Sequence, residues 1–378
     1  MSEFIPRLLA PKIEEAHRYF PVIVVTGPRQ SGKTSLCRHL YPSYKYVNLE
    51  DITTRVAAAA DPTGFLISLG DKVIIDEVQN VPELLSMIQV MVDEDRSRSY
   101  MLTGSSNFSL LSNVSQSLAG RSALYTLLPF SLPEIGASTM SETTDELMLR
   151  GLYPGVIADG IPPQLFYRNY YNTYVERDLR SLLNVKNILA FDTFMRLLAA
   201  RVGSEFNAST IAREAGVSSA TVSEWLSILA TSYIAFPLRP YFNNLSKQLT
   251  KMPKVYFYDT GLLCFLLGIE DVAQLDKHPF KGAIFENLAI CELMKRELNA
   301  GKDPHINFYR EKSGLEVDAV VSSASQLHLY EIKASSTLRP DFISNMKYTA
   351  ERIPGAVSST VIYNGPQMPP TAVNIRDI

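Results

Sequence analysis

The stretch from Gly27 to Thr34 contains residue types and spacings that suit phosphate chemistry. It fits the pattern G-x-x-x-x-G-K-[ST] after an apolar run, and it reads Gly27-Pro28-Arg29-Gln30-Ser31-Gly32-Lys33-Thr34, with Ser35 next. Glycines permit backbone angles that bulkier residues resist, so backbone amides and the start of the following helix can surround anionic oxygens. Lys33 would neutralise the outer phosphates and Thr34 would bind Mg²⁺. The pattern predicts that residues 27–35 bind ATP.

Two acids, Asp76 and Glu77, follow a second apolar run, Val73-Ile-Ile. Asp76 at the tip of a strand can hold the water shell of Mg²⁺, and Glu77 can polarise an attacking water molecule. Without other signals, the pair Asp76 and Glu77 would be interpreted as an ordinary strand end followed by a turn that the acids cap. Together with the phosphate loop, residues 27–34, it favours hydrolysis of the nucleotide, in which Lys33 and Glu77 are the catalytic candidates.

A third group of charged residues lies towards the C-terminus. Glu331 and Lys333 are two apart in an apolar strand pattern, so they point to one face, and a hairpin would bring Asp318 alongside. Glu286 lies on the preceding helix. The three carboxylates are candidate ligands for Mg²⁺ or Mn²⁺, and Lys333 would position or deprotonate a water molecule. The alternative is a buried Glu–Lys pair that braces the sheet.

These four positions resemble the PD-(D/E)XK nuclease constellation. The resemblance makes Asp318, Glu331 and Lys333 the core triad and Glu286 a helix-borne acid. Phe308-Tyr309-Arg310 is also similar to that family. Tyr309 and Arg310 either orient a phosphate or belong to strand packing with an exposed cation.

The elements that would position these residues are strands alternating with helices. This order predicts an α/β fold with a mainly parallel, doubly wound sheet. The strand candidates are 22–26, 44–49, 72–75, 100–103 and 123–128, and the helix candidates are 33–41 and 82–93. Beyond residue 254, strands and a long helix over 280–299 predict a second, smaller α/β domain.

The middle of the chain predicts a helix-turn-helix. Ser209 can cap a short helix that ends at Gly216, Ser218 or Ser219 can open the next helix, and a β-rich segment follows over 233–242. The second helix offers Ser, Thr and Glu224 but no basic residue for reading bases, which favours a winged-helix lid. Four cations near it leave DNA as a candidate partner, and these are Arg239, Lys247, Lys251 and Lys254. A solvated loop face is the alternative for these cations.

Composition excludes several classes of protein. The net charge of −3 argues against bulk coating of nucleic acid, and 46% hydrophobic residues in 378 exclude a disordered chain. Three distant cysteines predict neither a disulfide framework nor a structural zinc site. We see no secretory signal and no apolar run long enough for a bilayer, so we expect a cytoplasmic protein without a membrane segment.

Nearly the whole chain resembles a prokaryotic subfamily of AAA+ type P-loop ATPases that carry a winged-helix segment and a PD-(D/E)XK-like domain. The matching stretches are 27–35, 73–79, 102–107, 120–121, 127–134, 153–155, 174–178, 256–269 and 285–333. The resemblance implies that Ser105, Ser106 or Asn107 senses the γ-phosphate. It also implies that Arg121 contacts this phosphate within the chain or from a neighbouring subunit, so a homo-oligomer is a candidate assembly. The alternative for Arg121 is a solvated surface arginine.

The sequence thus predicts three segments. They are an ATPase domain (1–160), a helical and winged helix-turn-helix segment (161–250) and a nuclease-like domain (251–378). We expect a Mg²⁺-dependent ATPase whose nucleotide state controls the C-terminal domain, which would act on DNA. The alternative is an ATP-driven regulatory switch whose C-terminal domain is a catalytically silent docking module.

Overall fold

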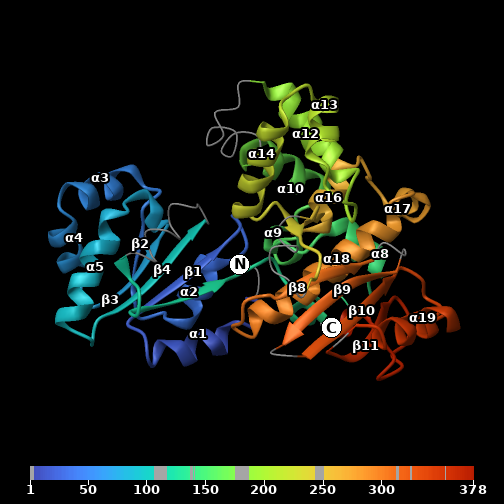
Figure 1. Ribbon diagram of the computed structural model, residues 1–378. Coiled ribbons are helices and arrows are strands. Elements are labelled where there is room, and N and C mark those ends of the chain that lie inside the picture. Colours follow the sequence, from blue (N-terminus) through green and yellow to red (C-terminus); the bar gives the residue numbers. More distant parts are fainter. Residues whose placement is uncertain are drawn as a thin grey trace.

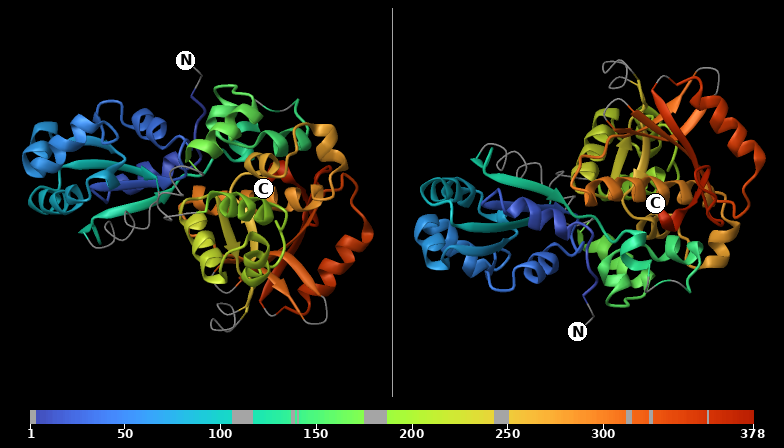
Figure 2. Two further views of the ribbon diagram at one scale, coloured as in Figure 1. Left: turned by 90° about the horizontal axis from the view of Figure 1, so that it is seen from above. Right: turned by 90° about the horizontal axis from the view of Figure 1, so that it is seen from below.

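The computed structural model describes residues 4–105, 117–136, 139, 141–174, 187–242, 251–311, 315–323, 326–353 and 355–378. Its ribbon forms two lobes (Figures 1 and 2). The buried hydrophobic residues up to Leu127 belong to the hydrophobic clusters of the first lobe, and those from Leu128 onward belong to the clusters of the second. The described residues before α1 run along the junction between the lobes, as both views of Figure 2 show.

A five-stranded parallel sheet forms the centre of the first lobe, in the order β2-β3-β4-β1-β5. The strands are β1 (Val22–Gly27), β2 (Lys45–Asn48), β3 (Lys72–Asp76), β4 (Ser99–Ser105) and β5 (Ser122–Thr126). The helices are α1 (Ala10–His17), α2 (Lys33–Leu40), α3 (Ile52–Ala60), α4 (Pro62–Leu69), η1 (Val78–Asn80) and α5 (Glu83–Glu94). The predicted α/β fold with a parallel sheet is confirmed.

Strand β1 shows why the sheet forms here. Val22 and Val24 pack with α4 and α5 on one face, whereas Ile23 and Val25 pack with α1 and α2 on the other. A strand that is covered on both faces reads as a continuous apolar run instead of an alternating one. Sequence alone did not predict α3 and α4, which connect β2 to β3.

Helices make up most of the middle of the chain. Their bounds are α7 (Leu132–Ile135), α8 (Thr144–Arg150), α9 (Pro154–Ile157), α10 (Pro163–Tyr170), α12 (Ile188–Ala199), α13 (Ala208–Ala215), α14 (Ser219–Thr231), α16 (Thr260–Leu266) and α17 (Val272–Lys277). Strands β6 (Ala235–Leu238) and β7 (Lys254–Phe257) form an antiparallel pair after α14.

The expected helix-turn-helix needs two corrections. The cap of α13 is Asn207, whose side chain accepts from the Thr210 amide, and not Ser209. The strand within 233–242 is only four residues long. Gly216 ends α13 in the left-handed conformation, as the sequence predicted, and of the two candidates Ser218 and Ser219 it is Ser218 that caps α14.

A mixed sheet forms the C-terminal part, in the order β12-β11-β10-β9-β8. Its elements are α18 (Lys281–Asn299), β8 (Ile306–Arg310), β9 (Glu316–Ser323), β10 (Gln326–Lys333), α19 (Pro340–Ala350), β11 (Ala356–Tyr363), β12 (Ala372–Asn374) and η4 (Ile375–Asp377). The long helix predicted over 280–299 is present as α18. Buried residues of α18 belong to one hydrophobic cluster of this sheet, and buried residues of α19 belong to another.

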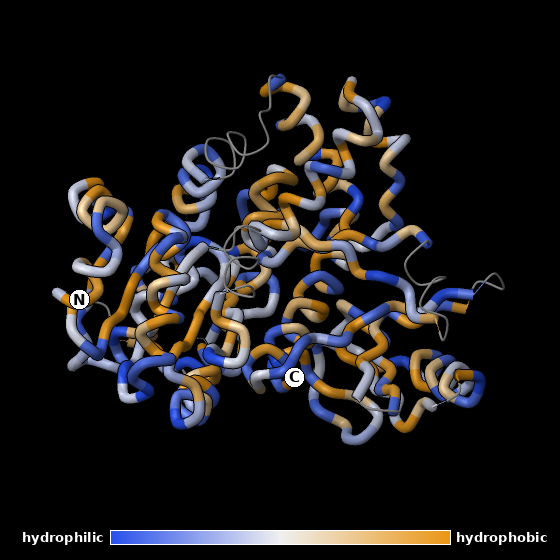
Figure 3. Tube along the Cα trace, turned by 60° about the vertical axis from the view of Figure 1, so that its left-hand side comes forward, coloured by the Kyte–Doolittle hydropathy of each residue, from blue (hydrophilic) through white to orange (hydrophobic). Residues whose placement is uncertain are grey.

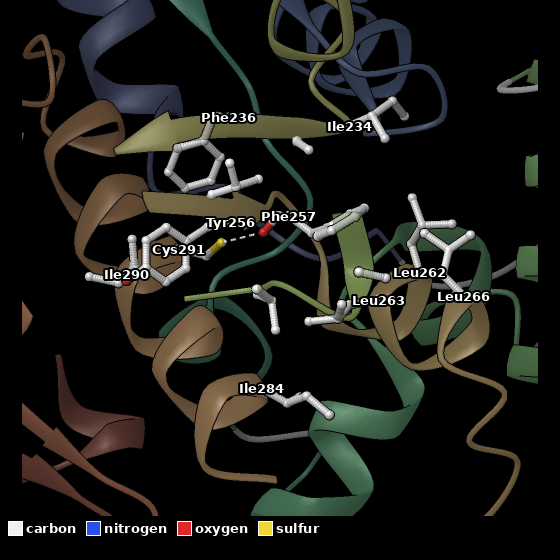
Figure 4. Packing of buried hydrophobic residues seen from close by; sticks show 14 of the residues in the cluster. Ile234, Phe236, Tyr256, Phe257, Leu262, Leu263, Leu266, Ile284, Ile290 and Cys291 are labelled. Carbon is white, nitrogen blue, oxygen red and sulfur yellow. Dashed lines mark hydrogen bonds between the residues drawn. The ribbon is translucent and has the colours of Figure 1, made fainter. Parts of the chain in front are cut away.

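One hydrophobic core joins the middle and C-terminal parts. Figure 4 shows Phe236 and Tyr256 from the β6–β7 pair beside Ile290 and Cys291 of α18, and the Cys291 thiol donates to the Phe257 carbonyl. In Figure 3, hydrophobic stretches run through strands and inner helix faces, while hydrophilic stretches follow many outer turns. Within the described residues, we find no helix with the length and apolar character needed to cross a membrane.

Candidate functional site

The phosphate loop connects the end of β1 to the start of α2. Gly27 has φ +142°, and a Cβ atom there would lie 2.1 Å from the Leu127 carbonyl oxygen. Gln30 (φ +61°) and Gly32 (φ +93°) are also in the left-handed region. The loop therefore adopts a shape that requires glycine at position 27.

Lys33 is buried in the loop. Its Nζ donates to the carbonyls of Gly27 and Pro28 over 3.0 and 2.7 Å. Burial lowers the pKa of Lys33, against the opposing charges of Glu77 and Asp76. These two hydrogen bonds keep the Lys33 ammonium group inside the phosphate loop, next to its first two residues.

Asp76 contacts both the phosphate loop and two neighbouring strands. Thr34 and Tyr46 donate to its Oδ2 over 2.7 and 2.9 Å, and Thr103 donates to its Oδ1. The carboxyl ends of parallel β2, β3 and β4 place these groups at one edge of the sheet. A carboxylate and a threonine hydroxyl together are the hard oxygen ligands that suit Mg²⁺.

Glu77 follows in the left-handed conformation, with φ +55°. Its Oε2 accepts from the amide and hydroxyl of Ser105, each at 3.2 Å, and from the Gln79 side chain. Of the three candidate γ-phosphate sensors, Ser105 is therefore next to the proposed water activator. Ser106 and Asn107 lie outside the described residues.

A cavity of about 790 Å³ opens between the phosphate loop and the helices of the second lobe. On the loop side its lining includes Arg29, Gln30, Gly32, Lys33, Thr34, Ser35 and Glu77. On the other side are α9, α10, their connection and Thr173. The apolar and aromatic lining residues are Pro154, Gly155, Ile161, Leu165, Phe166 and Tyr170, and the polar ones are Asp159, Asn169 and Thr173. The apolar part of this wall is suited to a planar base, and the loop side to its phosphates.

Sequence reasoning missed the second wall of this cavity. The only signal was the stretch Tyr153-Pro-Gly, together with the aromatic helical pattern that follows. These residues lie more than a hundred positions from the phosphate loop. Only the tertiary structure brings them to it.

The structure does not bring Arg121 to the phosphate loop. Arg121 precedes β5, and its carbonyl accepts from the Val22 amide at the amino end of β1. The loop follows the opposite, carboxyl end of that strand. The Arg121 guanidinium forms a bidentate pair with Asp93, at 2.6 and 2.7 Å. Contact with a γ-phosphate in the same chain is incompatible with this arrangement. Two of the interpretations remain, contact from a neighbouring subunit and a surface arginine that only pairs with Asp93.

The C-terminal charged residues do come together. The antiparallel pairing of β9 with β10 places Asp318 beside Glu331, and the Lys333 Nζ lies 2.6 Å from Glu331 and 3.9 Å from Asp318. The Ile332 amide donates to Asp318 Oδ2 over 2.8 Å. Burial and the Asp318 charge raise the pKa of Glu331 to about 7. Burial also raises the pKa of Asp318.

Glu286 lies next to this group and accepts from Tyr256 and Lys254. Lys254 is buried, and its Nζ also lies 2.6 Å from Glu316. Its expected role as a DNA-contacting cation is therefore wrong, because it is paired with acids inside the fold. Across the described part of the chain, no three Asp, Glu, His or Cys side chains form a group suited to a metal ion. The carboxylates Glu286, Asp318 and Glu331 instead share two lysines.

The other candidate phosphate contacts have mixed settings. Arg239 and Lys251 are exposed, whereas Lys247 lies outside the described residues. Arg310 is 3.3 Å from Glu205 and 3.6 Å from Glu316, and the Tyr309 hydroxyl donates to Glu311. Tyr309 and Arg310 are therefore already paired with acids. This favours the interpretation that they belong to strand packing over the one in which they orient a phosphate.

Comparison with known proteins assigns the chain to a family. Residues 19–136 match the family described as AAA domain, residues 141–273 match a domain of unknown function (DUF8612), and residues 281–376 match another (DUF4143). The uncharacterized protein Rv2008c of Mycobacterium tuberculosis is 31% identical over 333 residues, which cover 87% of this chain and 74% of that protein. The chain belongs to the same family. Its N-terminal part is an AAA-type P-loop ATPase domain.

Similar proteins also occur outside mycobacteria. The uncharacterized protein MJ1544 of Methanocaldococcus jannaschii is 22% identical, over 79% of this chain and 71% of that protein. Among solved structures, the Walker-type ATPase PABY2304 of Pyrococcus abyssi matches with TM-score 0.43 and 14% identity, over 68% of this chain and 94% of that one. The RuvB Holliday junction branch migration motor of Thermotoga maritima matches with TM-score 0.32 and 17% identity, over 61% and 87%.

Proposed function

We propose that the protein is a Mg²⁺-dependent ATPase whose nucleotide state controls its C-terminal part. The observation that supports this most directly is the 2.7 Å contact between Thr34 and Asp76, beside the buried Lys33 and a cavity of nucleotide size. The proposal also treats 1–160, 161–250 and 251–378 as separate functional segments, although buried residues between 128 and 160 share one hydrophobic core with the other two segments. We also keep a homo-oligomer in which Arg121 acts on a neighbouring subunit.

The roles of the residues follow from their positions. Thr34 and Asp76 would hold Mg²⁺, which when bound would neutralise phosphate charge. Lys33 would leave its carbonyl partners for the outer phosphates, and Glu77, oriented by Ser105, would polarise the attacking water. The apolar cavity wall at Ile161, Leu165 and Phe166 would take the base.

Two variants test this proposal. Lys33→Ala should abolish nucleotide binding in isothermal titration calorimetry, and Glu77→Gln should keep binding while ATP turnover falls by about 100-fold or more. Glu83→Gln, at the start of the neighbouring α5, is a matched control for the loss of one acid. Turnover unchanged in both variants would contradict the proposal.

We propose a nuclease-like fold for the C-terminal part as a second, separable hypothesis. It is supported by the shared face of Asp318, Glu331 and Lys333 on adjacent strands. In favour of the alternative, a silent docking module, two lysines neutralise the carboxylates in this structure. DNA contact through the exposed Arg239 and Lys251, in a winged-helix segment formed by α12–α14 and β6–β7, belongs to the same hypothesis.

The two alternatives predict different outcomes with metal. Cleavage of DNA or RNA with Mg²⁺ or Mn²⁺ that disappears in Glu331→Ala and Lys333→Ala would establish the nuclease. Absence of cleavage in every nucleotide state would favour the docking module. Asp303→Ala removes an acid from the loop before β8 and is a control for nonspecific effects of charge.

A further inference from the structure

Arg7 is a buried arginine that the proposed chemistry does not use. It precedes α1, and only 5% of its surface is exposed. A charged side chain is rarely so buried unless all of its surroundings are arranged to receive it. Its surroundings include the phosphate loop.

The Arg7 guanidinium connects three parts of the chain. Nη1 donates to the Ser31 carbonyl of the phosphate loop over 2.9 Å, and Nη2 donates to the Leu128 carbonyl over 2.7 Å. Nε donates to Glu134 Oε1 over 3.1 Å, and the group lies 4.7 Å from the centre of the Phe130 ring. A planar guanidinium can serve acceptors in three directions, whereas a lysine ammonium cannot match this geometry.

Both carboxylate oxygens of Glu134 accept hydrogen bonds. Its Oε1 also accepts from the Leu8 amide, and its Oε2 accepts from the Ser131 amide, both at 2.8 Å. Its side chain has no exposed surface. The carboxylate therefore fixes Arg7 against the segment from Leu128 to Glu134, which we call the brace.

The residue just before the brace supports the first residue of the phosphate loop. Leu127, which directly precedes the brace, donates through its amide to the Thr26 carbonyl over 2.8 Å, and its own carbonyl leaves no room for a side chain at Gly27. Arg7 in turn lies 3.7 Å from where a Cβ at Gly32 would stand. The phosphate loop is thus held at its start by the backbone of Leu127 and near its end, at Ser31, by the Arg7 side chain.

We propose that Arg7 is a positioning residue of the nucleotide site, which fixes the phosphate loop in its binding shape by tying Ser31 to the brace. The proposal rests on the proposed nucleotide binding. A loop that is already ordered loses less conformational entropy when the ligand arrives, so Arg7 strengthens nucleotide binding without touching the nucleotide.

The test measures binding of Mg·ADP to the full chain by calorimetry, at a temperature where every variant is folded. Arg7→Met should weaken binding by about tenfold or more, since the loop loses a charge-assisted hydrogen bond. Arg7→Lys should bind with an affinity between those of Arg7→Met and the wild type. Arg201→Met removes an ion pair in which Arg201 Nη2 donates to both carboxylate oxygens of Glu214 on α13. It is the matched control and should bind as the wild type does.

A double variant separates positioning from general stability. Arg7→Met leaves Glu134 buried without its cation. Arg7→Met combined with Glu134→Gln removes that charge but also takes the acceptor from one of the two backbone amides, of Leu8 or Ser131, so the double variant should regain only part of the lost unfolding temperature. Its affinity for Mg·ADP should stay low, because Ser31 still lacks its donor. Recovery of affinity in the double variant, or unchanged affinity in Arg7→Met, would overturn the inference. A wild type that binds no nucleotide would instead refute the proposed function.

Discussion

The buried pair of Glu292 and Lys295 on α18 allows a quantitative prediction. Their side chains are 1% and 2% exposed, and their charged atoms are 2.7 Å apart. Both also contact the brace, since Leu132 donates its amide to Glu292 and Lys295 donates to the Phe130 carbonyl, each over 2.8 Å. Lys295→Met leaves the carboxylate buried with one backbone donor, which should cost about 3–5 kcal/mol of unfolding free energy.

The cost should depend on pH in a defined direction. Burial raises the pKa of Glu292 above its ordinary 4.5, although Lys295 opposes this shift. Removing Lys295 raises the pKa further, so the folded form binds a proton more tightly than the unfolded chain. Stability of the variant should therefore fall as pH rises above 4.5, by at most about 1.4 kcal/mol per pH unit.

Urea unfolding at pH 5 and pH 8, followed by tryptophan fluorescence, measures both effects. Trp225 is the single tryptophan and belongs to the same hydrophobic core as Leu132 and Leu293. Arg196→Met, which breaks an exposed pair with Asp192, is the control and should cost no more than about 0.5 kcal/mol. An equal cost of Lys295→Met at both pH values would refute the reasoning.

Three further predictions concern the two sites. Leu165 is half exposed in the cavity wall, so Leu165→Asp should keep the fold and weaken ATP binding by about tenfold, measured by calorimetry. The pKa of Glu331, measured by carboxyl NMR of the labelled protein, should be about 7. Lys333→Met should raise this pKa further, because it removes the neighbouring positive charge. A pKa near 4.5 in the wild type would contradict the burial argument. The stability that proton binding to Glu331 contributes should be lost as pH rises through about 7. Arg121→Ala should leave ATP affinity unchanged, because the residue lies at the opposite end of β1, and should slow turnover only at protein concentrations that support assembly.

The juxtaposition of the phosphate loop with the acids after β3 was predictable because its signals are local. The phosphate loop and the acids after β3 each lie within a few residues, and β1 reads as an apolar run because both of its faces are covered. Parallel pairing then brings the loop and the acids to one edge of the sheet. The hairpin that unites Asp318 and Glu331 was predictable for the same reason.

Contacts between distant segments were not predictable. Lys254 reads in sequence as one of several cations without nearby acids, yet it is buried against Glu286 and Glu316 from other elements. Arg7 in sequence is a single cation near the start of the chain, and its partners are more than twenty residues away. Spacing carries no information about such pairs, because tertiary packing alone determines them.

The attachment of α18 to the brace limits how this architecture can evolve. Glu292 and Lys295 come from the C-terminal part but satisfy backbone groups of the segment that also anchors the phosphate loop. A recombination event that exchanged the C-terminal part between relatives would be tolerated only if the incoming helix supplied the same acid and base one turn apart. We expect these two positions to vary together across the family, and hybrid proteins that mismatch them to fold poorly.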